Sequence, residues 1–147
     1  MQDLHYDIVI AAPVARVWDC MFDATTYADW TRAFCEGSTY EGSWAQGARI
    51  VFRDPDGNGM EAIVDEHRLH ERLSLRLVGE ISAGRPVADS PLAATPAHER
   101  YEFSALPGGG TQLTVHLQSW NDGFLAFLRD TWPRALQRLK ALAESTH

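Results

Sequence analysis

The last segment of the chain, Asn121 to Glu144, has hydrophobic residues at intervals of three and four positions. At about 100° per residue, this spacing places them on one half of an α-helix and leaves charged residues on the other half. The hydrophobic half comprises Phe124, Phe127, Leu128, Thr131, Trp132, Ala135, Leu136, Leu139 and Leu142. A helix this long with one hydrophobic face needs a large partner surface, which we expect the preceding residues to provide.

Pro133 lies on the polar half of this predicted helix. A proline inside a helix removes one backbone hydrogen bond and clashes with the preceding turn. We therefore expect a bend with its convex side toward solvent. The alternative is a break near Thr131, after which Pro133 begins a second helix.

The N-terminal run from Leu4 to Ile10 alternates hydrophobic and polar residues, which predicts a strand with one buried face. Two short amphipathic helices are expected to follow it. Pro13 suits a first helical position, and hydrophobic residues then recur at helical spacing up to Met21. The same spacing returns between Tyr27 and Phe34, which predicts the second short helix.

From Thr39 onward the period becomes that of β-strands, with glycine, proline and asparagine in the connections. The predicted strands are residues 39–40, 48–53, 60–68, 73–81, 98–105 and 111–119. Their short connections favour an antiparallel meander. Residues 82–97 contain three prolines and no regular period, which predicts a long irregular loop, either a binding loop or a mobile connection.

Successive strand residues point to opposite faces of a sheet, so position in the alternation separates a hydrophobic face from a charged one. The hydrophobic face, expected to meet the long helix, collects Ala48, Ile50, Phe52, Met60, Ala62, Val64, Leu73, Leu75, Leu77, Tyr101, Phe103, Leu113, Val115 and Leu117. The charged face, expected to meet solvent, collects Arg49, Arg53, Glu61, Asp65, His67, Ser74, Arg76, Glu80, Arg100, Glu102, Thr114 and His116. The hydrophobic face either packs solidly against the helix or leaves a cavity beneath it.

Composition limits the class of protein. With 147 residues, 45% of them hydrophobic and 22% charged, the chain is expected to form one globular domain spanning residues 1–147. The net charge of -7 disfavours nucleic acid and anionic membrane surfaces as partners. No hydrophobic run is long enough to span a membrane, and no signal peptide is recognisable. We expect a cytoplasmic protein in which Cys20 and Cys35 are reduced, buried thiols.

Common catalytic and nucleotide-binding motifs are absent from the sequence, and we expect no cofactor. His67 and His70 have a spacing that two metal ligands could use. However, His67 and His116 fall on the charged face and His70 falls in a turn. These histidines are expected to be ordinary surface residues, with no metal site.

Glu66 and Glu99 are the candidate catalytic residues, because both fall on or near the hydrophobic face. Burial there would raise the pKa of a carboxyl group and suit it to act as a general base. The alternative is an ion pair at the rim of the sheet, with Arg68 or Arg100 as the partner.

The candidate ligand-binding residues come from the hydrophobic faces of the predicted helices and strands. Tryptophans on these faces can line a pocket and offer an indole N–H to a ligand oxygen. The predicted set is Trp30, Phe52, Met60, Val64, Leu75, Leu77, Tyr101, Phe103, Val115, Phe127, Leu128 and Trp132.

Several short motifs follow one another in the order found in a known superfamily. They are Ile8-Val9-Ile10-Ala11-Ala12-Pro13, Val17-Trp18-Asp19, Tyr27 with Trp30, Tyr40-Glu41-Gly42-Ser43-Trp44 with Gly47, Gly110-Thr111, Leu113-Thr114-Val115, and Trp132, Leu136 and Leu139-Lys140. On these residues the chain resembles the SRPBCC superfamily, the START and polyketide cyclase-like helix-grip proteins. It is most similar to the heat-shock ATPase activator-like branch.

The resemblance implies an α+β helix-grip fold, in which a curved antiparallel sheet wraps around a long C-terminal helix, with two short helices after the first strand. It also implies a cavity between sheet and helix. Members bind lipids, sterols, polyketides or hormones, and some are cyclases, hydrolases or co-chaperones, so the fold does not determine the function.

Our leading hypothesis is a protein that binds a hydrophobic or amphipathic small molecule in this cavity, with residues 82–97 near its entrance. One alternative is a polyketide cyclase-like or hydrolase-like enzyme, in which Glu66 or Glu99 acts as base and Tyr101 orients a carbonyl group. The other is a co-chaperone-like protein-interaction module. Homodimerisation is compatible with the sequence.

Overall fold

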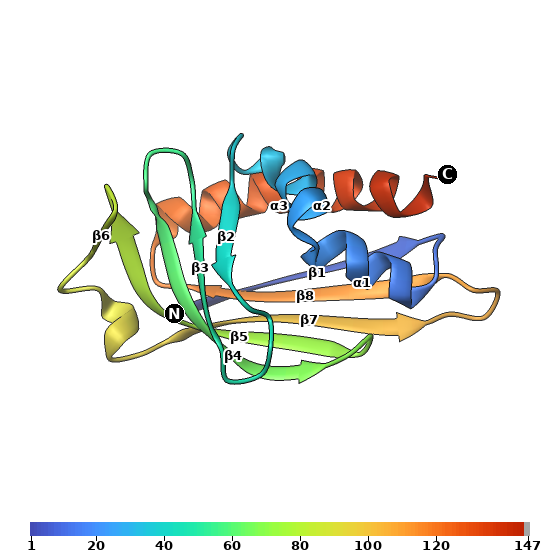
Figure 1. Cartoon of the computed structure of the whole chain (residues 1–147), viewed down its shortest axis with the longest axis horizontal. Coiled ribbons are helices and arrows are strands. Elements are labelled where there is room, and N and C mark those ends of the chain that lie inside the picture. The colour runs from blue at the N-terminus through green and yellow to red at the C-terminus, as the bar shows by residue number, and fades with distance from the viewer. Residues whose placement is uncertain (146–147) are drawn as a thin grey trace.

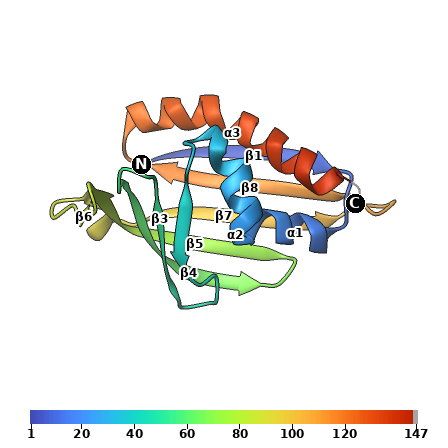
Figure 2. The ribbon, with the colours of Figure 1, turned by 45° about the horizontal axis from the view of Figure 1, so that its top comes forward.

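A curved antiparallel sheet carries the long C-terminal helix across one of its faces in the computed structural model, which describes residues 1–145 (Figures 1 and 2). The strand order is β1-β8-β7-β5-β4-β3-β2, and the short strand β6 pairs with β5. The strands are β1 (Gln2–Ile10), β2 (Thr39–Gly42), β3 (Arg49–Arg53), β4 (Gly59–Arg68), β5 (Arg72–Ser82), β6 (Arg85–Pro86), β7 (Ala97–Ala105) and β8 (Thr111–Ser119).

The helices lie together on the inner face of this sheet (Figure 2). They are α1 (Val14–Phe22), α2 (Ala24–Trp30), the 3-10 turn η1 (Thr31–Ala33) and the long helix α3 (Asp122–Glu144). A second 3-10 turn, η2 (Pro91–Ala93), lies between β6 and β7. The predicted α+β helix-grip fold, with two short helices after the first strand, is therefore confirmed.

Helix α3 is continuous through Pro133, so the alternative of a break near Thr131 is wrong. Asn121 caps its start, since the Asn121 side chain accepts a hydrogen bond of 3.0 Å from the Phe124 backbone N–H. Pro133 cannot donate to the carbonyl of Arg129, one turn earlier. Both residues are exposed, so water can reach the carbonyl that the proline leaves without its helical partner.

The buried stripe of α3 differs from the predicted one: Leu125 and Ala143 are buried without having been predicted, Phe124 and Leu142 are only partly buried, and Phe127 is exposed. Phe127 was expected to face inward, yet 39% of it is exposed, whereas Leu125 is 1% exposed. Seven residues separate Leu125 from Trp132, which at about 100° per residue places the two almost in line, while Phe127 lies about 140° away. Leu125 therefore belongs to the buried stripe and Phe127 to its margin.

The C-terminal end of α3 is attached to the junction of β1 and α1. Arg16 of α1 donates from Nε to the Ala143 carbonyl at 2.5 Å, and its Nη2 reaches two further carbonyls at the helix end. Glu144 accepts a hydrogen bond of 2.8 Å from the Ala11 backbone N–H. Lys140 pairs with Glu144 and donates to the Val9 carbonyl at 2.9 Å. The last carbonyls of α3 have no partners within the helix, and the positively charged side chain of Arg16 therefore caps this end by donating hydrogen bonds to them.

Residues 82–97 are more regular than predicted. Ser82 and Arg85 pair across a tight turn that begins strand β6, and Ser90 caps η2 by accepting a hydrogen bond from the Leu92 N–H. The turn itself has positive φ at Ala83 and Gly84. Short-range capping and turn geometry create these elements, and neither produces a hydrophobic period that the sequence pattern could reveal.

The two cysteines have free thiols. Cys20 is buried as predicted, but Cys35 is exposed, because it follows η1 at the edge of the helical layer. Within residues 1–145, none of the helices is both long enough and hydrophobic enough to cross a membrane.

Replacement of Arg16 by Ala should lower the free energy of unfolding by about 1.5–3 kcal/mol, because hydrogen bonds to charged groups contribute on this scale. Urea denaturation followed by circular dichroism measures the change. Arg32→Ala is the matched control, since Arg32 is exposed on η1 and has no hydrogen-bond or ion-pair partner within the described chain. Equal losses in the two variants would contradict the capping role of Arg16.

Candidate functional site

A cavity of about 1010 Å³ lies between the N-terminal half of α3, the helices α1 and α2, and one end of the sheet. Its floor is formed by inward residues of β3, β4, β5 and β7, and its walls are largely aromatic. The hydrophobic and aromatic lining comprises Met21, Phe22, Tyr27, Trp30, Phe34, Trp44, Phe52, Met60, Leu77, Ile81, Val87, Pro91, Leu92, Ala97, Tyr101, Trp120, Phe124, Phe127, Leu128 and Trp132.

The structure divides the predicted ligand-binding residues into two groups. The group that lines the cavity is Trp30, Phe52, Met60, Leu77, Tyr101, Phe127, Leu128 and Trp132. The group that does not is Val64, Leu75, Phe103 and Val115, all of which are buried in the packed core. Phe103 shows the reason: its ring lies 5.0 Å from that of Trp18 and 6.1 Å from that of Phe22, both on α1. Helix α1 fills this end of the inner face.

Aromatic contacts fix the wall on the helical side. Trp132 of α3 lies 5.9 Å from Trp30 and 5.0 Å from Phe34, measured between ring centroids. The indole N–H of Trp30 donates to the Met21 carbonyl at 3.2 Å. Near the same helix end, Trp44 donates to the Phe22 carbonyl at 3.1 Å. The end of α1 therefore holds two tryptophans of the lining in fixed positions.

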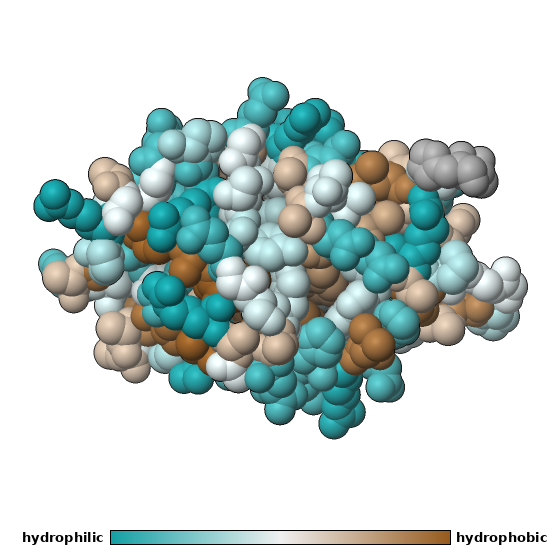
Figure 3. All heavy atoms as spheres, in the orientation of Figure 1, coloured by the Kyte–Doolittle hydropathy of each residue, from teal (hydrophilic) through white to brown (hydrophobic). Residues whose placement is uncertain are grey.

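Residues of the segment 82–97 contribute to the cavity lining. Val87, Pro91 and Leu92 from this segment line the cavity, and the indole N–H of Trp120 donates to the Thr95 carbonyl at 3.1 Å. Trp120 is 42% exposed. Hydrophobic residues are visible among hydrophilic ones on the side of the molecule where β6 lies (Figure 3). The segment thus forms part of the lining and is attached by this hydrogen bond to the residue before the N-cap of α3.

Glu99 of β7 projects into the cavity together with Tyr101 on the same strand face. The Tyr101 hydroxyl donates to Oε2 of Glu99 at 2.7 Å. Burial raises the pKa of Glu99, and the hydrogen bond from Tyr101 partly opposes this rise. Burial, followed by the charge of Glu99, raises the pKa of Tyr101 well above its usual value. No basic side chain within residues 1–145 forms an ion pair with Glu99.

Glu66, the other predicted carboxylate, does not face the cavity. Asp65 is an extra residue in β4, because Val64 pairs with Leu75 and Glu66 with the next residue of β5, Ser74. Such a β-bulge reverses the alternation beyond it. Glu66 therefore points to the outer face, where it forms ion pairs of 2.9 Å with Arg68 and 3.3 Å with Arg72. The ion-pair alternative with Arg68 holds for this residue.

The same bulge turns His67 inward, contrary to the prediction. Its Nδ1 lies 2.7 Å from the Trp44 carbonyl, and its ring lies 5.3 Å from that of Trp18. A second bulge, at Val78 in β5, has the corresponding effect on Glu80, which was predicted to face solvent and instead lines the cavity. The two bulges therefore place Glu66, His67 and Glu80 on the face of the sheet opposite to the predicted one.

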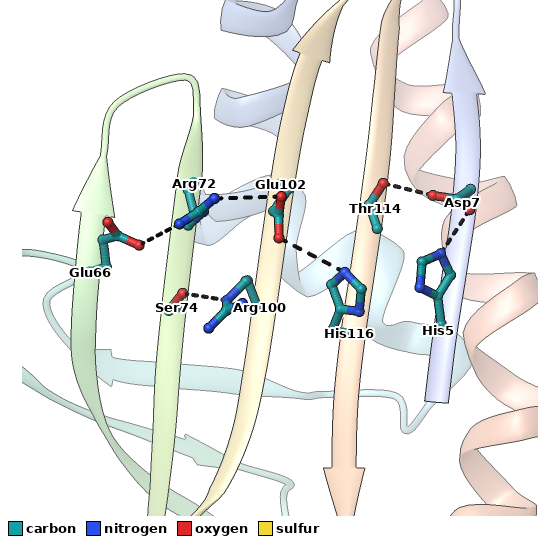
Figure 4. A network of polar contacts seen from close by, with 9 residues as sticks. All are labelled: His5, Asp7, Glu66, Arg72, Ser74, Arg100, Glu102, Thr114 and His116. Atoms are coloured by element: carbon teal, nitrogen blue, oxygen red, sulfur yellow. Dashed lines mark hydrogen bonds and ion pairs between the residues drawn. The ribbon is translucent and has the colours of Figure 1, made fainter. Parts of the chain in front are cut away.

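The outer face of the sheet carries a network of polar contacts, drawn in Figure 4. Arg72 joins Glu66 to Glu102, which in turn lies 3.9 Å from Nε2 of His116. At the β1 edge, Asp7 accepts a hydrogen bond of 2.7 Å from Thr114 and approaches His5 at 2.8 Å. His116 is on this face as predicted. Among residues 1–145, no group of three or more His, Cys, Asp or Glu side chains is placed to hold a metal ion.

Tyr27 is the main lining residue that the sequence analysis did not select. Its ring stacks on Phe52 at 6.2 Å and meets Tyr40 edge-on at 5.0 Å. Burial, then the nearby charge of Glu99, raises the pKa of Tyr27. The helical spacing of Tyr27 and Trp30 was visible in the sequence, but nothing there indicated that Tyr27 would line the same cavity as Glu99 of β7.

The sequence matches the family of Activator of Hsp90 ATPase homolog 1-like proteins over residues 11–144. The chain therefore belongs to this family, and the helix-grip resemblance is confirmed. None of the curated proteins matches the sequence.

Solved structures share the fold at low sequence identity. Protein MLL2253 from Mesorhizobium loti is 15% identical with a TM-score of 0.77, and the match covers 99% of each chain. DynU16, a putative protein in the dynemicin biosynthetic locus, is 19% identical with a TM-score of 0.74 over 99% of this chain and 48% of that one. Aha1 from Colwellia psychrerythraea, a dimer in solution, is 17% identical with a TM-score of 0.71 over all of both chains. At these identities the likeness shows the fold alone.

The raised pKa of Glu99 predicts that its carboxyl makes the folded state less stable as the pH rises. Above about pH 4.3, an unfolded chain loses the proton of this residue while the folded chain keeps it, up to the raised pKa of the folded state. We therefore expect the difference in free energy of unfolding, parent minus Glu99→Gln, to fall as the pH rises from about 4.3 to the raised pKa of Glu99 in the folded state. Below about pH 4.3 the difference should be constant. Urea denaturation at a series of pH values measures it, and a difference that is constant with pH would contradict the prediction.

Proposed function

We propose that the protein binds a hydrophobic or amphipathic small molecule in the cavity beneath α3. The observation that carries this proposal is the cavity itself, because about 1010 Å³ of space matches the upper end of the range of small-molecule sites. Aromatic and aliphatic residues form the larger part of its lining, beside twelve polar or charged residues, and a mainly hydrophobic lining with polar groups in it is the usual composition of such sites. An interior filled by side chains would have favoured an interaction module instead.

Acid–base chemistry on the bound molecule is a second candidate function. Its support is Glu99, a buried carboxyl group that faces the cavity without a basic partner in the described chain. A carboxyl group with a raised pKa can exchange a proton with a substrate near neutral pH. In this alternative Glu99 is the base and Tyr101 its positioning residue. Glu66 has no part in it, since that residue lies on the outer face.

Three further expectations remain proposals. The family description refers to the Hsp90 ATPase, which suggests a co-chaperone-like role through the outer surface of the molecule. The dimer of the Colwellia protein supports homodimerisation of this chain. The cytoplasmic localisation expected from the sequence is also retained as a proposal.

A neutral fluorescent probe, N-phenyl-1-naphthylamine, tests the binding function. The parent protein should bind it with enhanced emission, because the probe leaves water for an apolar site. Met60→Trp should weaken binding at least about tenfold, since Met60 lines the cavity and the larger side chain fills it.

Val9→Trp is the matched control, because Val9 is 56% exposed and is not part of the lining. It should leave the dissociation constant unchanged, and circular dichroism should show both variants folded. If the parent protein failed to bind the probe, or if Met60→Trp bound it as well as the parent, the proposal would be wrong. If the parent binds the probe and Met60→Trp does not, native mass spectrometry of protein from its own host identifies any ligand retained by the parent and absent from Met60→Trp.

Trp120→Phe should speed probe exchange a few-fold, because it removes the hydrogen bond between the start of α3 and the segment 82–97. The phenyl ring preserves much of the hydrophobic contact, so affinity should change less than the rate constants. Stopped-flow fluorescence measures association and dissociation directly. Unchanged rate constants would show that this contact does not control entry.

A further inference from the structure

Glu99 interrupts a row of hydrophobic side chains that crosses the inner face of the sheet. In register, Glu99 pairs with Leu75 on one side and Leu117 on the other. The row continues to Val64 beyond Leu75 and to Leu4 beyond Leu117. These four neighbours are buried. A carboxyl group at this position costs desolvation free energy that a hydrophobic residue would not, and such a conflict with local packing rules is characteristic of functional sites.

The carboxyl group of Glu99 is only half satisfied by the protein. Tyr101 donates to Oε2, while Oε1 has no hydrogen-bond partner within residues 1–145. The orientation of Tyr101 is fixed by two rings, those of Trp132 at 6.2 Å and Phe22 at 5.9 Å. The second oxygen is therefore held in a defined place on the cavity surface with its hydrogen-bonding capacity unused.

Tyr27 brings a second unused group to the same place. Tyr27 lines the cavity, and its hydroxyl has no hydrogen-bond partner in the described chain. Burial first, and then the charge of Glu99, raises the pKa of Tyr27. Helix α2 and strand β7 thus each contribute a polar group, from Tyr27 and Glu99, to the lining of the same cavity.

The charges around the cavity bear on the kind of molecule that fits. The charged residues in the lining are Glu99, Glu80, Asp54 and Arg53, three acids and one base. The other arginines of the sheet close to Glu99 in sequence or register, such as Arg100 and Arg76, make their contacts on the outer face. Acids outnumber the single base, Arg53, whose Nε has no hydrogen-bond partner within residues 1–145. An anionic ligand would therefore meet net negative charge, and a cation would lose its hydration in a mainly hydrophobic space.

We propose that the free oxygen of Glu99 and the hydroxyl of Tyr27 form a hydrogen-bonding site for one hydroxyl or carbonyl oxygen of an uncharged, mostly hydrophobic ligand. This inference rests on the proposed binding function and adds the ligand class. A protonated Glu99 donates to a carbonyl oxygen, and an ionised Glu99 accepts from a hydroxyl group. Tyr27 can donate or accept in either case. Tyr101 acts as a positioning residue, because it holds Glu99 rather than the ligand.

Four probes of nearly equal shape test this ligand class at pH 7: pyrene, 1-hydroxypyrene, 1-pyrenecarboxylate and protonated 1-pyrenemethylamine. Fluorescence titration gives each dissociation constant. The parent protein should bind 1-hydroxypyrene about tenfold more tightly than pyrene, the ratio expected for one net hydrogen bond. It should bind the carboxylate more weakly than 1-hydroxypyrene. Tighter binding of the carboxylate or of the amine than of 1-hydroxypyrene would overturn the uncharged class.

Variants locate the effect on the named residues. Glu99→Leu should bind pyrene as well as the parent does and should lose most of the preference for 1-hydroxypyrene. Glu99→Gln should keep that preference within about threefold, because an amide can still hydrogen-bond. Tyr27→Phe should reduce it in part. Tyr40→Phe is the control for loss of a tyrosine hydroxyl, since Tyr40 donates to the Phe22 carbonyl at 2.7 Å and is not part of the lining.

The outcomes separate the two levels of the proposal. If no pyrene derivative binds, the binding function itself fails. If pyrene and 1-hydroxypyrene bind equally to the parent, or if Glu99→Leu keeps the full preference, binding stands and the hydrogen-bonding site is refuted. Because pyrene affinity reports the integrity of the cavity in every variant, a variant that merely unfolds is recognised by losing all four probes.

Discussion

The attachment of the C-terminal half of α3 to the β1–α1 junction is the contact on which the cavity depends. Arg16, Lys140 and Glu144 connect this half of the helix to backbone groups that lie more than a hundred residues away in the sequence. Beyond Trp132, no residue of α3 lines the cavity, and Ala135, Leu136 and Leu139 lie in the packed core. The helix is thus held at one end, and the cavity lies beneath the other, where Phe124 and Phe127 line it.

Aromatic side chains keep that space from closing. Trp30, Phe34 and Trp132 pack against one another across the two helices, and Trp132 also reaches Tyr101 of the sheet. Large flat rings with few rotatable bonds lose little conformational entropy when they are fixed in place. A wall of this kind can hold its shape around an empty or occupied cavity, whereas flexible aliphatic chains would tend to collapse into it.

Strand alternation and helical spacing in the sequence were sufficient for the architecture and for most inward residues. Ile50, Leu113 and Val115 face inward as the alternation predicts, because no bulge interrupts their strands. The prediction was wrong beyond Asp65 and Val78, where one extra residue reverses the alternation. Glu66 and Glu80 exchange sides as a result. A bulge leaves no mark on a hydrophobic period that is only a few residues long, so these two reversals required the structure.

The predicted lining was wrong for a different reason at Val64, Leu75, Phe103 and Val115. These residues face inward as expected, but alternation cannot distinguish an inner face covered by another element from one that borders a cavity. The distinction depends on where α1 places Trp18 and Phe22, which is a tertiary contact between segments some 80 residues apart. Tyr27 was missed for the same reason, since its importance comes from Glu99 on a distant strand.

The distribution of charge over the two faces of the sheet explains why Glu99 stands out. On the outer face, carboxylates have cationic or hydroxyl partners in water, as in the series from Glu66 through Arg72 to Glu102, and such exposed pairs contribute little to stability. Inside, the structure pairs Glu99 with a tyrosine hydroxyl and with no cation among the described residues. The desolvation cost of that carboxyl is not offset by the fold, which a hydrophobic residue in the same row would serve better. The three solved structures compared above share less than a fifth of their residues with this chain. For the binding function proposed above, ligand specificity would come from interior residues that packing alone does not require, and Glu99 is the clearest of them.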